Sequence, residues 1–310
     1  MSIRFIDAGE VARRLTYEAA VPLVRQAMIA LAQGRTRQLL RGIIDLDGGN
    51  AFGVMPGAMD QGSFGAKLVS VFPGNVTRGG MSHQGLIVMF DPETGAPVAV
   101  VDAGEVTAIR TAAASAAATQ ALALGDANHL AVLGTGEQAR RHILAIRAIR
   151  PLQRVTIWGR DAARAAALAE ELGCETAPSP CEAVADAAII CTVTAAAEPI
   201  LFAPDVRAGS HINAVGSSRA GPAEIATDLV VRSRFFADHR AGVLNQGAEF
   251  LRAKAEGAID DDHVLGEIGE VFAGSLAGRT AAQDVTLYKS LGSIVQDLAC
   301  AAWLCREDGG

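Results

Sequence analysis

The segment from His129 to Arg150 constrains the fold more than any other part of the chain. A short apolar run, His129–Leu133, leads without spare residues into Gly134-Thr135-Gly136-Glu137-Gln138-Ala139 and then into an amphipathic pattern. In such a strand–turn–helix the first glycine makes the turn, the second lets the backbone approach a pyrophosphate, and the helix N-terminus presents free N–H groups. The motif predicts a dinucleotide-binding unit; an ordinary glycine turn between a strand and a helix is the alternative.

The composition indicates a folded α/β protein with a substantial core. The chain has 310 residues, enough for about two domains, and 50% are hydrophobic while 20% are charged. The net charge of -7 gives no reason to expect a nucleic-acid partner. The five cysteines form no C-x-x-C pair, so we expect reduced thiols and no metal ligation. With charges near its start and no long apolar run, the sequence also predicts a cytoplasmic protein without membrane contact.

The end of the second predicted strand bears on the choice between NAD and NADP. Arg154–Trp158 is followed by Gly159-Arg160-Asp161, where an NAD site usually places a carboxylate for the ribose 2′-hydroxyl. Asp161 better fits the N-cap of a helix over 162–172, which leaves Arg160 to accommodate a 2′-phosphate. We therefore expect NADP(H) to be favoured, with NAD(H) possible.

Two later strands of the same unit end in polar or small residues. The strand over 188–191 runs into Thr192, and the strand over 211–215 ends at Val215 before a Gly-Ser-Ser segment. Ligands bind at the carboxyl edge of a parallel sheet. Thr192-Val193-Thr194 and Gly216-Ser217-Ser218 are therefore candidates for contact with a nicotinamide or a substrate.

The N-terminal half has a different pattern, with a helix over 16–33 followed by extended segments and a hairpin. Asp91-Pro92-Glu93-Thr94-Gly95 separates two apolar runs, which is a strong turn signal. Adjacent antiparallel strands differ from the alternating strands and helices further on, so a separate mixed-sheet α+β domain is predicted. Segments near 55–61 and 241–247 lack a clear pattern, and we expect them to be loops that form part of a substrate pocket.

Three basic residues of this half are candidates for binding an acidic group. Lys67 shares a strand face with apolar residues, so its ammonium either reaches solvent or is kept for chemistry. Arg110 lies in an alanine-rich helix, where it either binds a carboxylate bidentately or faces water. Arg41 differs from the two arginines before it because it directly enters a predicted strand.

Six segments, taken together, resemble the ornithine cyclodeaminase/μ-crystallin family. They are spread in order over nearly the whole chain, which makes the resemblance more specific than any single motif. The segments are Gly65-Ala66-Lys67, Ser82-His83-Gln84-Gly85, Thr107-Ala108-Ile109-Arg110-Thr111-Ala112-Ala113, Gly134-Thr135-Gly136-Glu137-Gln138-Ala139, Ile212-Asn213-Ala214-Val215-Gly216 and Asp284-Val285-Thr286-Leu287-Tyr288-Lys289-Ser290.

This resemblance implies a homodimer of two-domain chains. Residues 1–120 with 285–310 would form the substrate-binding and dimerisation domain, and residues 121–284 a Rossmann NAD(P)-binding domain. The expected fold class is therefore α/β, with a mixed-sheet α+β domain added. Members of the family act on amino acids or cyclic imino acids with NAD(P), so the partner expected is a small imino or amino acid.

The resemblance also assigns roles to residues by their position in the motifs. Arg41, Lys67 and Arg110 match the residues that bind the substrate carboxylate and form the catalytic centre. The positions that match cofactor neighbours are Ser82, Arg110, Thr111, Gly134, Gly136, Glu137, Gln138, Arg160, Val215 and Ser290.

One departure from the family pattern bears on the reaction. Cyclodeaminases carry Gly-Gly-Asp-Cys-Pro-Gly-Lys after the Asn-Ala-Val segment, whereas this chain has Ser218 at the aspartate position and Pro222 at the lysine position. A serine supplies no carboxylate to an ammonium substrate, but its hydroxyl can orient an imine or relay a proton. The expectation is reduction of an α-imino acid, with Lys67, Arg110 and Ser218 as catalytic residues. An amino acid dehydrogenase, a cyclodeaminase and a non-catalytic NADP-binding regulator are the alternatives.

Overall fold

The computed structural model describes residues 3–60, 62–217 and 219–306. The chain forms two compact units: the first unit is Met1–Arg110 with Ser293–Gly310, and the second unit is Thr111–Gly292. The α/β class expected from the sequence is confirmed, because each unit contains its own sheet with helices. The domain boundaries at 120 and 284 stay a prediction.

The first unit contains a mixed sheet of seven strands in the order β1-β7-β6-β5-β4-β2, with β3 also paired to β4. The pair β1 and β7 is parallel, and the other pairs are antiparallel. Its strands are β1 (Arg4–Ile6), β2 (Thr36–Gln38), β3 (Gly42–Leu46), β4 (Asn50–Met59), β5 (Phe64–Val71), β6 (His83–Phe90) and β7 (Pro97–Asp102).

The hairpin between β6 and β7 forms at the turn that the sequence indicated. Asp91 accepts hydrogen bonds from the backbone N–H of Glu93 and of Thr94, at 3.1 and 2.8 Å. Gly95 follows with a φ of 70°, a left-handed conformation that glycine adopts without strain. The antiparallel pairing of the mixed-sheet unit is thus set by local turn chemistry.

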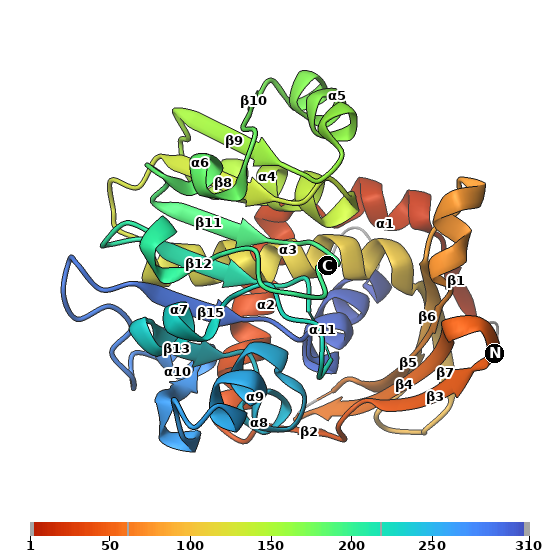
Figure 1. Cartoon of the computed structure of the whole chain (residues 1–310). Helices are drawn as coiled ribbons and strands as arrows, with labels where there is room; N and C mark the ends of the chain where they lie inside the picture. Colours follow the sequence, from red (N-terminus) through yellow and green to blue (C-terminus); the bar gives the residue numbers. More distant parts are fainter. Residues whose placement is uncertain (1–2, 61, 218, 307–310) are drawn as a thin grey trace. The chain divides into compact units, whose positions relative to one another are not determined.

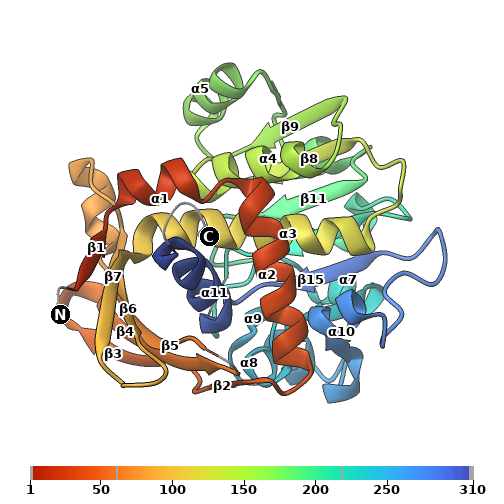
Figure 2. The same ribbon diagram turned by 180° about the vertical axis from the view of Figure 1, so that it is seen from behind.

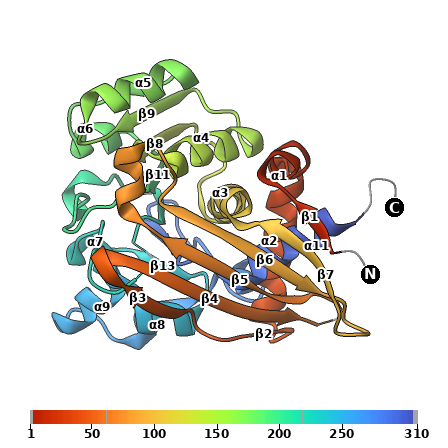
Figure 3. The same cartoon turned by 90° about the vertical axis from the view of Figure 1, so that its right-hand side faces the viewer.

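Helices cover one face of this sheet, as Figure 3 shows. The helix α11 packs on α2 and lies against β4, β5 and β6. On the opposite face, apolar side chains remain partly exposed, among them Phe5 at 62% and Ile44 at 58%. The helices of the unit are α1 (Ala8–Arg14), α2 (Tyr17–Ala32), α11 (Ile294–Cys305) and the first turns of α3 (Ala103–Leu122), with 3₁₀ turns at Asp47–Gly49 and Pro73–Arg78.

The second unit is built on an eight-stranded parallel sheet, most of whose strands, from β10 to β13, are labelled in Figure 1. Its order is β10-β9-β8-β11-β12-β15-β13-β14, so the chain reverses direction across the sheet between β8 and β11. Such a switch point is where open α/β sheets bind ligands. The strands are β8 (His129–Leu133), β9 (Arg154–Trp158), β10 (Glu175–Thr176), β11 (Ile189–Thr192), β12 (His211–Ala214), β13 (Arg234–Ala237), β14 (Val264–Glu267) and β15 (Thr286–Lys289).

The core of the second unit consists of buried aliphatic side chains from the central strands and the helices on them. The later part of α3 contributes alanines that are almost completely buried, and their small size lets neighbouring backbone approach closely. The remaining helices, seen from behind in Figure 2, are α4 (Glu137–Ile149), α5 (Ala162–Leu172), α6 (Pro180–Val184), α7 (Thr227–Arg232), α8 (Arg240–Gln246), α9 (Ala248–Ala255) and α10 (Ile268–Ala273), with 3₁₀ turns at Ala203–Asp205 and Asp261–His263.

Two segments expected to be loops are regular structure. Most of 55–61 belongs to β4, and most of 241–247 to the helix α8. Gly57 has a packing role in β4: a Cβ there would lie 2.7 Å from Cγ2 of Ile294, because α11 packs directly on this strand. The prediction that both segments are loops was therefore wrong, whereas their contribution to a substrate pocket stays a prediction.

Candidate functional site

The glycine turn after β8 has the geometry that a pyrophosphate requires. Gly134 has a φ of 136°, and a Cβ there would lie 2.8 Å from the carbonyl oxygen of Val193, so the turn closes tightly against the loop after β11. Gly136 begins α4, and a Cβ at Gly136 would meet no atom within 4 Å. The first glycine thus makes the turn, and the second leaves open space above free helical N–H groups.

The first turn of α4 places two predicted cofactor neighbours side by side. Glu137 forms an ion pair of 2.5 Å with Arg141 one turn later. The Oε1 of Gln138 is buried and has no hydrogen-bond partner among the residues that the structure describes. A buried amide oxygen without a partner is costly, so this position is suited to a polar ligand.

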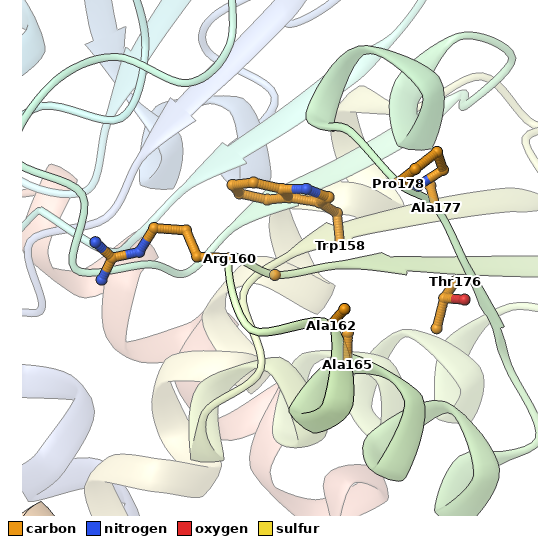
Figure 4. A pocket seen from close by; sticks show the side chains of 8 residues that line it. Trp158, Arg160, Ala162, Ala165, Thr176, Ala177 and Pro178 are labelled. Atoms are coloured by element: carbon orange, nitrogen blue, oxygen red, sulfur yellow. The ribbon is translucent and has the colours of Figure 1, made fainter.

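A pocket of about 540 Å³ lies at the end of β9. Figure 4 shows Trp158 and Arg160 at this strand end, with the side chains of α5 and of the segment after β10 beside them. Asp161 caps α5 by accepting from the backbone N–H of Ala163 and Arg164, which confirms its expected role as an N-cap. The carboxylate is thereby committed to the helix, and Arg160 is the charged residue that lines the pocket.

Three strand ends meet at the carboxyl edge of the parallel sheet. The N–H of Val215 donates to the carbonyl of Thr192 at 3.0 Å, and the N–H of Ser290 donates to Ala214 at 3.0 Å. The hydroxyl of Ser290 is buried and lacks a hydrogen-bond partner among the described residues. The structure therefore brings Thr192, Val215 and Ser290 together on adjacent strands, next to the glycine turn. Ser218 lies outside the described residues.

Sequence reasoning missed a buried carboxylate, Glu224, that connects these loops. Its two oxygens accept from the hydroxyls of Thr192 and Thr194, at 2.8 and 2.7 Å, and from the N–H groups of Thr194 and Gly216, at 2.5 and 2.7 Å. Burial raises the pKa of Glu224, while the hydrogen bonds from Thr194 oppose that rise. Glu224 thus holds the loops after β11 and β12 in register.

A second missed group is a fully buried ion pair behind Glu224. The ammonium of Lys289 lies 2.7 Å from Glu249, and both side chains are 0% exposed. Lys289 also donates to the carbonyl of Ser217 at 2.6 Å, while Glu249 accepts from the N–H of Glu224 at 3.2 Å. The charges therefore fix the loop that precedes position 218. Lys289 stood in a recognised motif, but nothing in the local pattern indicated its partner.

In the first unit, Lys67 and Arg110 are both 4% exposed and share one carboxylate. Oδ1 of Asp297 lies 3.1 Å from Nζ of Lys67 and 3.1 Å from Nε of Arg110. Lys67 also donates to the hydroxyl of Thr107 at 2.6 Å, and Nη1 of Arg110 donates to Gln296 at 2.9 Å. Lys67 therefore does not reach solvent and Arg110 does not face water. The alternative predictions, a solvent-reaching lysine and a surface arginine, were wrong.

The electrostatics of this cluster suit a group that titrates near neutral pH. Burial, together with the positive charges of Arg110 and Arg41, lowers the pKa of Lys67 to about 8 against the opposing charge of Asp297. For Asp297, burial would raise the pKa, but the charges of Arg110 and Lys67 outweigh it and the pKa is lowered. The buried cluster therefore combines two cations, Lys67 and Arg110, with one ionised carboxylate, and Arg41 acts on Lys67 electrostatically.

The remaining candidates have simple placements. Arg41 lies in the segment between β2 and β3, close enough to affect Lys67 electrostatically. Ser82 immediately precedes β6, and its carbonyl accepts from Phe72 at 2.8 Å. Thr111 follows Arg110 in α3 and is 8% exposed. Among the described residues, no group of three or more potential His, Cys, Asp or Glu metal ligands occurs, and no helix is long and apolar enough to cross a membrane.

Together, a parallel sheet with a dinucleotide-type glycine turn and a mixed sheet carrying buried cations define a two-unit Rossmann-type protein. The chain belongs to the ornithine cyclodeaminase/mu-crystallin family, whose model matches residues 4–308. This confirms the resemblance drawn from the six sequence segments.

Individual relatives cover almost the whole chain. The Delta(1)-pyrroline-2-carboxylate reductase of Colwellia psychrerythraea is 31% identical, over 96% of this chain and 97% of its own. The Thermococcus litoralis Delta(1)-pyrroline-2-carboxylate reductase, solved with NADH and L-proline, has a TM-score of 0.94 and 29% identity over 98% and 96% of the two chains. An archaeal alanine dehydrogenase dimer with bound NAD has a TM-score of 0.92 and 27% identity over 98% and 95%.

Proposed function

We propose that this protein is an NAD(P)H-dependent reductase that converts an α-imino acid into the corresponding amino acid. The observation that carries the proposal is the buried cluster of Lys67 and Arg110, two cations that share one carboxylate among the described residues and so leave positive charge for an acidic substrate. Relatives similar over nearly the whole chain reduce a cyclic imino acid of this class, pyrroline-2-carboxylate. The substrate is either such a cyclic imine or a linear one.

The cationic side chains have distinct tasks in this reaction. Arg110 uses Nε and Nη1 for Asp297 and Gln296, and the outer edge of its guanidinium binds the substrate carboxylate as a planar fork. Arg41 adds a second positive charge. Lys67 either binds the carboxylate as well or donates the proton that the imine nitrogen needs, and its pKa of about 8 keeps it mostly protonated at neutral pH. A hydroxyl at Ser218 is a further candidate for relaying that proton through water.

The residues of the second unit fit a nicotinamide dinucleotide, which would supply the hydride when bound. The open space at Gly136 suits the pyrophosphate, and the unpartnered polar atoms of Gln138 and Ser290 suit other parts of the molecule. Gly134, Glu137, Thr192 and Val215 line the same sheet edge and turn, while Ser82, Arg110 and Thr111 are the neighbours assigned by family position. Held in this way, a substrate can gain about 7–11 kcal/mol from orientation alone.

We further propose that NADP(H) is preferred to NAD(H). Arg160 lines the pocket at the end of β9, and the one acidic residue beside it, Asp161, is engaged in capping α5. An arginine at this point accommodates a 2′-phosphate. The Arg160→Ala variant should raise KM for NADPH at least tenfold with little change for NADH. Equal effects on both cofactors would refute this assignment.

The homodimer expected of the family is proposed to form through the open face of the mixed sheet. Ile44, Leu86 and Phe5 lie on that face and are 58%, 39% and 62% exposed. Apolar side chains gathered on one sheet face favour burial against a second copy. The Ile44→Lys variant should shift the mass measured by light scattering from dimer to monomer, whereas the exposed Arg13→Lys on α1 should not. A wild-type monomer at micromolar concentration would refute the proposal.

The reaction is tested by following absorbance of NADPH and NADH with a panel of cyclic and linear imino acids. The Arg110→Ala variant should lose turnover by at least a hundredfold while still binding the nucleotide, because the cofactor turn is left intact. Intact turnover in that variant, or no oxidation of either nucleotide by the wild type, would refute the proposal. Consumption of free ammonia with a keto acid would instead support the second candidate, an amino acid dehydrogenase like the archaeal relative.

A further inference from the structure

The carboxylate of Asp297 occupies an unusual position in the first unit. It is 0% exposed, and a single oxygen, Oδ1, accepts from Lys67 and from Arg110. The second oxygen, Oδ2, is buried and has no hydrogen-bond partner among the described residues. A buried carboxylate with a whole oxygen left unpaired is not optimised for stability.

Each of the two cations reaches Asp297 from a different part of the fold. Lys67 lies on β5 and Arg110 on α3, whereas Asp297 belongs to α11. Neutral side chains also bind each cation. Thr107 accepts a hydrogen bond from Lys67 at 2.6 Å and itself donates to the carbonyl of Ala103 at 2.5 Å. Gln296 accepts from Arg110 and donates to the sulfur of Met28 at 3.2 Å. The cations are therefore held on fixed partners.

The charge count of the cluster explains why one carboxylate is needed. The charged groups that act on Lys67 are Asp297 from α11, Arg110 from α3 and Arg41 from the segment before β3. Without Asp297, the buried ammonium of Lys67 and guanidinium of Arg110 would repel each other in a low-dielectric interior, where such interactions are strong. With Asp297, the two cations stay close together, and these three groups still carry a net positive charge.

We propose that Asp297 is a positioning residue for the reaction: its buried carboxylate holds the Lys67 ammonium and the Arg110 guanidinium side by side, so that both bind the carboxylate of an α-imino acid. This inference rests on the proposed function for the identity of the substrate. It also explains the unpaired oxygen, since Asp297 serves the arrangement of the cations rather than the best packing of α11.

The test compares Asp297→Asn with Asp297→Glu and with the neutral control Cys300→Ala, which alters packing one turn away on the same buried helix. Asparagine keeps the size and one acceptor but removes the charge. We expect kcat/KM for the imino acid to fall at least tenfold, and its alkaline limb to move by about one pH unit toward lower pH, because the charge that opposes deprotonation of Lys67 is lost. In Asp297→Glu the alkaline limb should lie closer to its wild-type pH, and in Cys300→Ala it should not move.

Two results would overturn the proposal. If Asp297→Asn lowers KM at unchanged kcat, the carboxylate merely repels the substrate and does not position the cations. If Asp297→Asn unfolds at a lower temperature but keeps the wild-type pH profile in its folded fraction, the role is structural only.

Binding separates this inference from the proposed function. Pyrrole-2-carboxylate, a planar carboxylate that cannot be reduced at a C=N bond, serves as the probe in calorimetry of the whole chain. We expect wild-type affinity to fall above about pH 8 and the affinity of Asp297→Asn to fall at lower pH. If the wild type binds the probe in this way but reduces no imino acid, the function fails and the positioning role stands. Equal pH dependence of the two proteins would refute the positioning role, whatever the activity.

Discussion

The fully buried pair of Lys289 and Glu249 allows a sharp prediction for the Lys289→Met variant. The ammonium lies 2.7 Å from Glu249 and donates to the carbonyl of Ser217, so methionine removes a charge and a donor while keeping the apolar stem. Glu249 then remains as a carboxylate without its counter-ion, bound to the backbone N–H of Glu224. It has almost no access to solvent, because Glu249 is 1% exposed.

The cost follows from the loss of one partner in a buried pair. Two charges 2.7 Å apart attract by about 6 kcal/mol at an effective dielectric constant of about 20. Because desolvation offsets part of this attraction, removing one partner of a buried pair typically costs about 3–5 kcal/mol. For a unit of roughly 180 residues with an unfolding entropy of about 2.1 cal/mol/K per residue, a loss of about 4 kcal/mol lowers Tm by roughly 10 °C.

The assay is thermal unfolding followed by calorimetry and circular dichroism, with two matched variants. Lys254→Met removes an exposed pair of 2.5 Å with Asp261, whose side chains are 45% and 49% exposed, and should change stability by less than about 1 kcal/mol. Adding Glu249→Gln to Lys289→Met removes the stranded charge and keeps an acceptor for Glu224, so most of the loss should be recovered. A Tm for Lys289→Met within about 3 °C of wild type, which corresponds to roughly 1 kcal/mol on the same scale, would refute this reasoning. So would a double variant no more stable than the single one.

Three further predictions concern the turn, the histidines and the lysine. Gly134→Ala should abolish binding of NADPH in a fluorescence titration, because the left-handed φ and the contact with Val193 leave no room for a Cβ; unchanged affinity would contradict the assigned turn. Burial lowers the pKa of His142 to about 4 and of His211 to about 3, so the unfolded chain binds protons that the folded chain excludes as pH falls below 6.5. The free energy of unfolding near pH 4.5 should therefore be lower by about 2–3 kcal/mol for each histidine. Urea unfolding should show a smaller loss at this pH in the His142→Gln variant than in the wild type. Finally, kcat/KM should fall above about pH 8 as Lys67 loses its proton, and a Lys67→Arg variant that keeps activity should lack this limb; a limb at the same pH in both proteins would assign it to another group.

Local signals were sufficient wherever the chemistry is contained in a few consecutive residues. The cap at Asp161 and the hairpin after Asp91 each depend on partners within three positions, so their geometry was predictable from sequence. The glycine turn was predictable from its own motif, although Gly134 also packs against the distant Val193. The same reasoning failed in β4, where a loop was expected. Gly57 is required there because a helix packs directly on the strand, and the local sequence does not reveal that contact. Tertiary packing there overrides the usual preference of glycine for loops.

The centre of the candidate site was less predictable for a related reason. Asp297 meets Lys67 and Arg110 from 230 and 187 residues away, and no local spacing encodes such a pairing. One signal was present: a Gln-Asp pair inside an otherwise apolar C-terminal helix over 294–305. A charged side chain on a helix that is buried all round needs an opposite charge nearby. The Gln-Asp pair could therefore have been matched with the lysine and the arginine that the sequence had already indicated as candidates.

The loop before position 218 brings these arguments together. Glu224 fixes it from one side through the N–H of Gly216, and Lys289 fixes it from the other through the carbonyl of Ser217. Two buried charged side chains that bind consecutive residues hold the backbone of Gly216 and Ser217 in one defined conformation. The proposed difference between imine reduction and deamination thus rests on the side-chain chemistry at sequence position 218, where this chain has a hydroxyl and the cyclodeaminase pattern has a carboxylate.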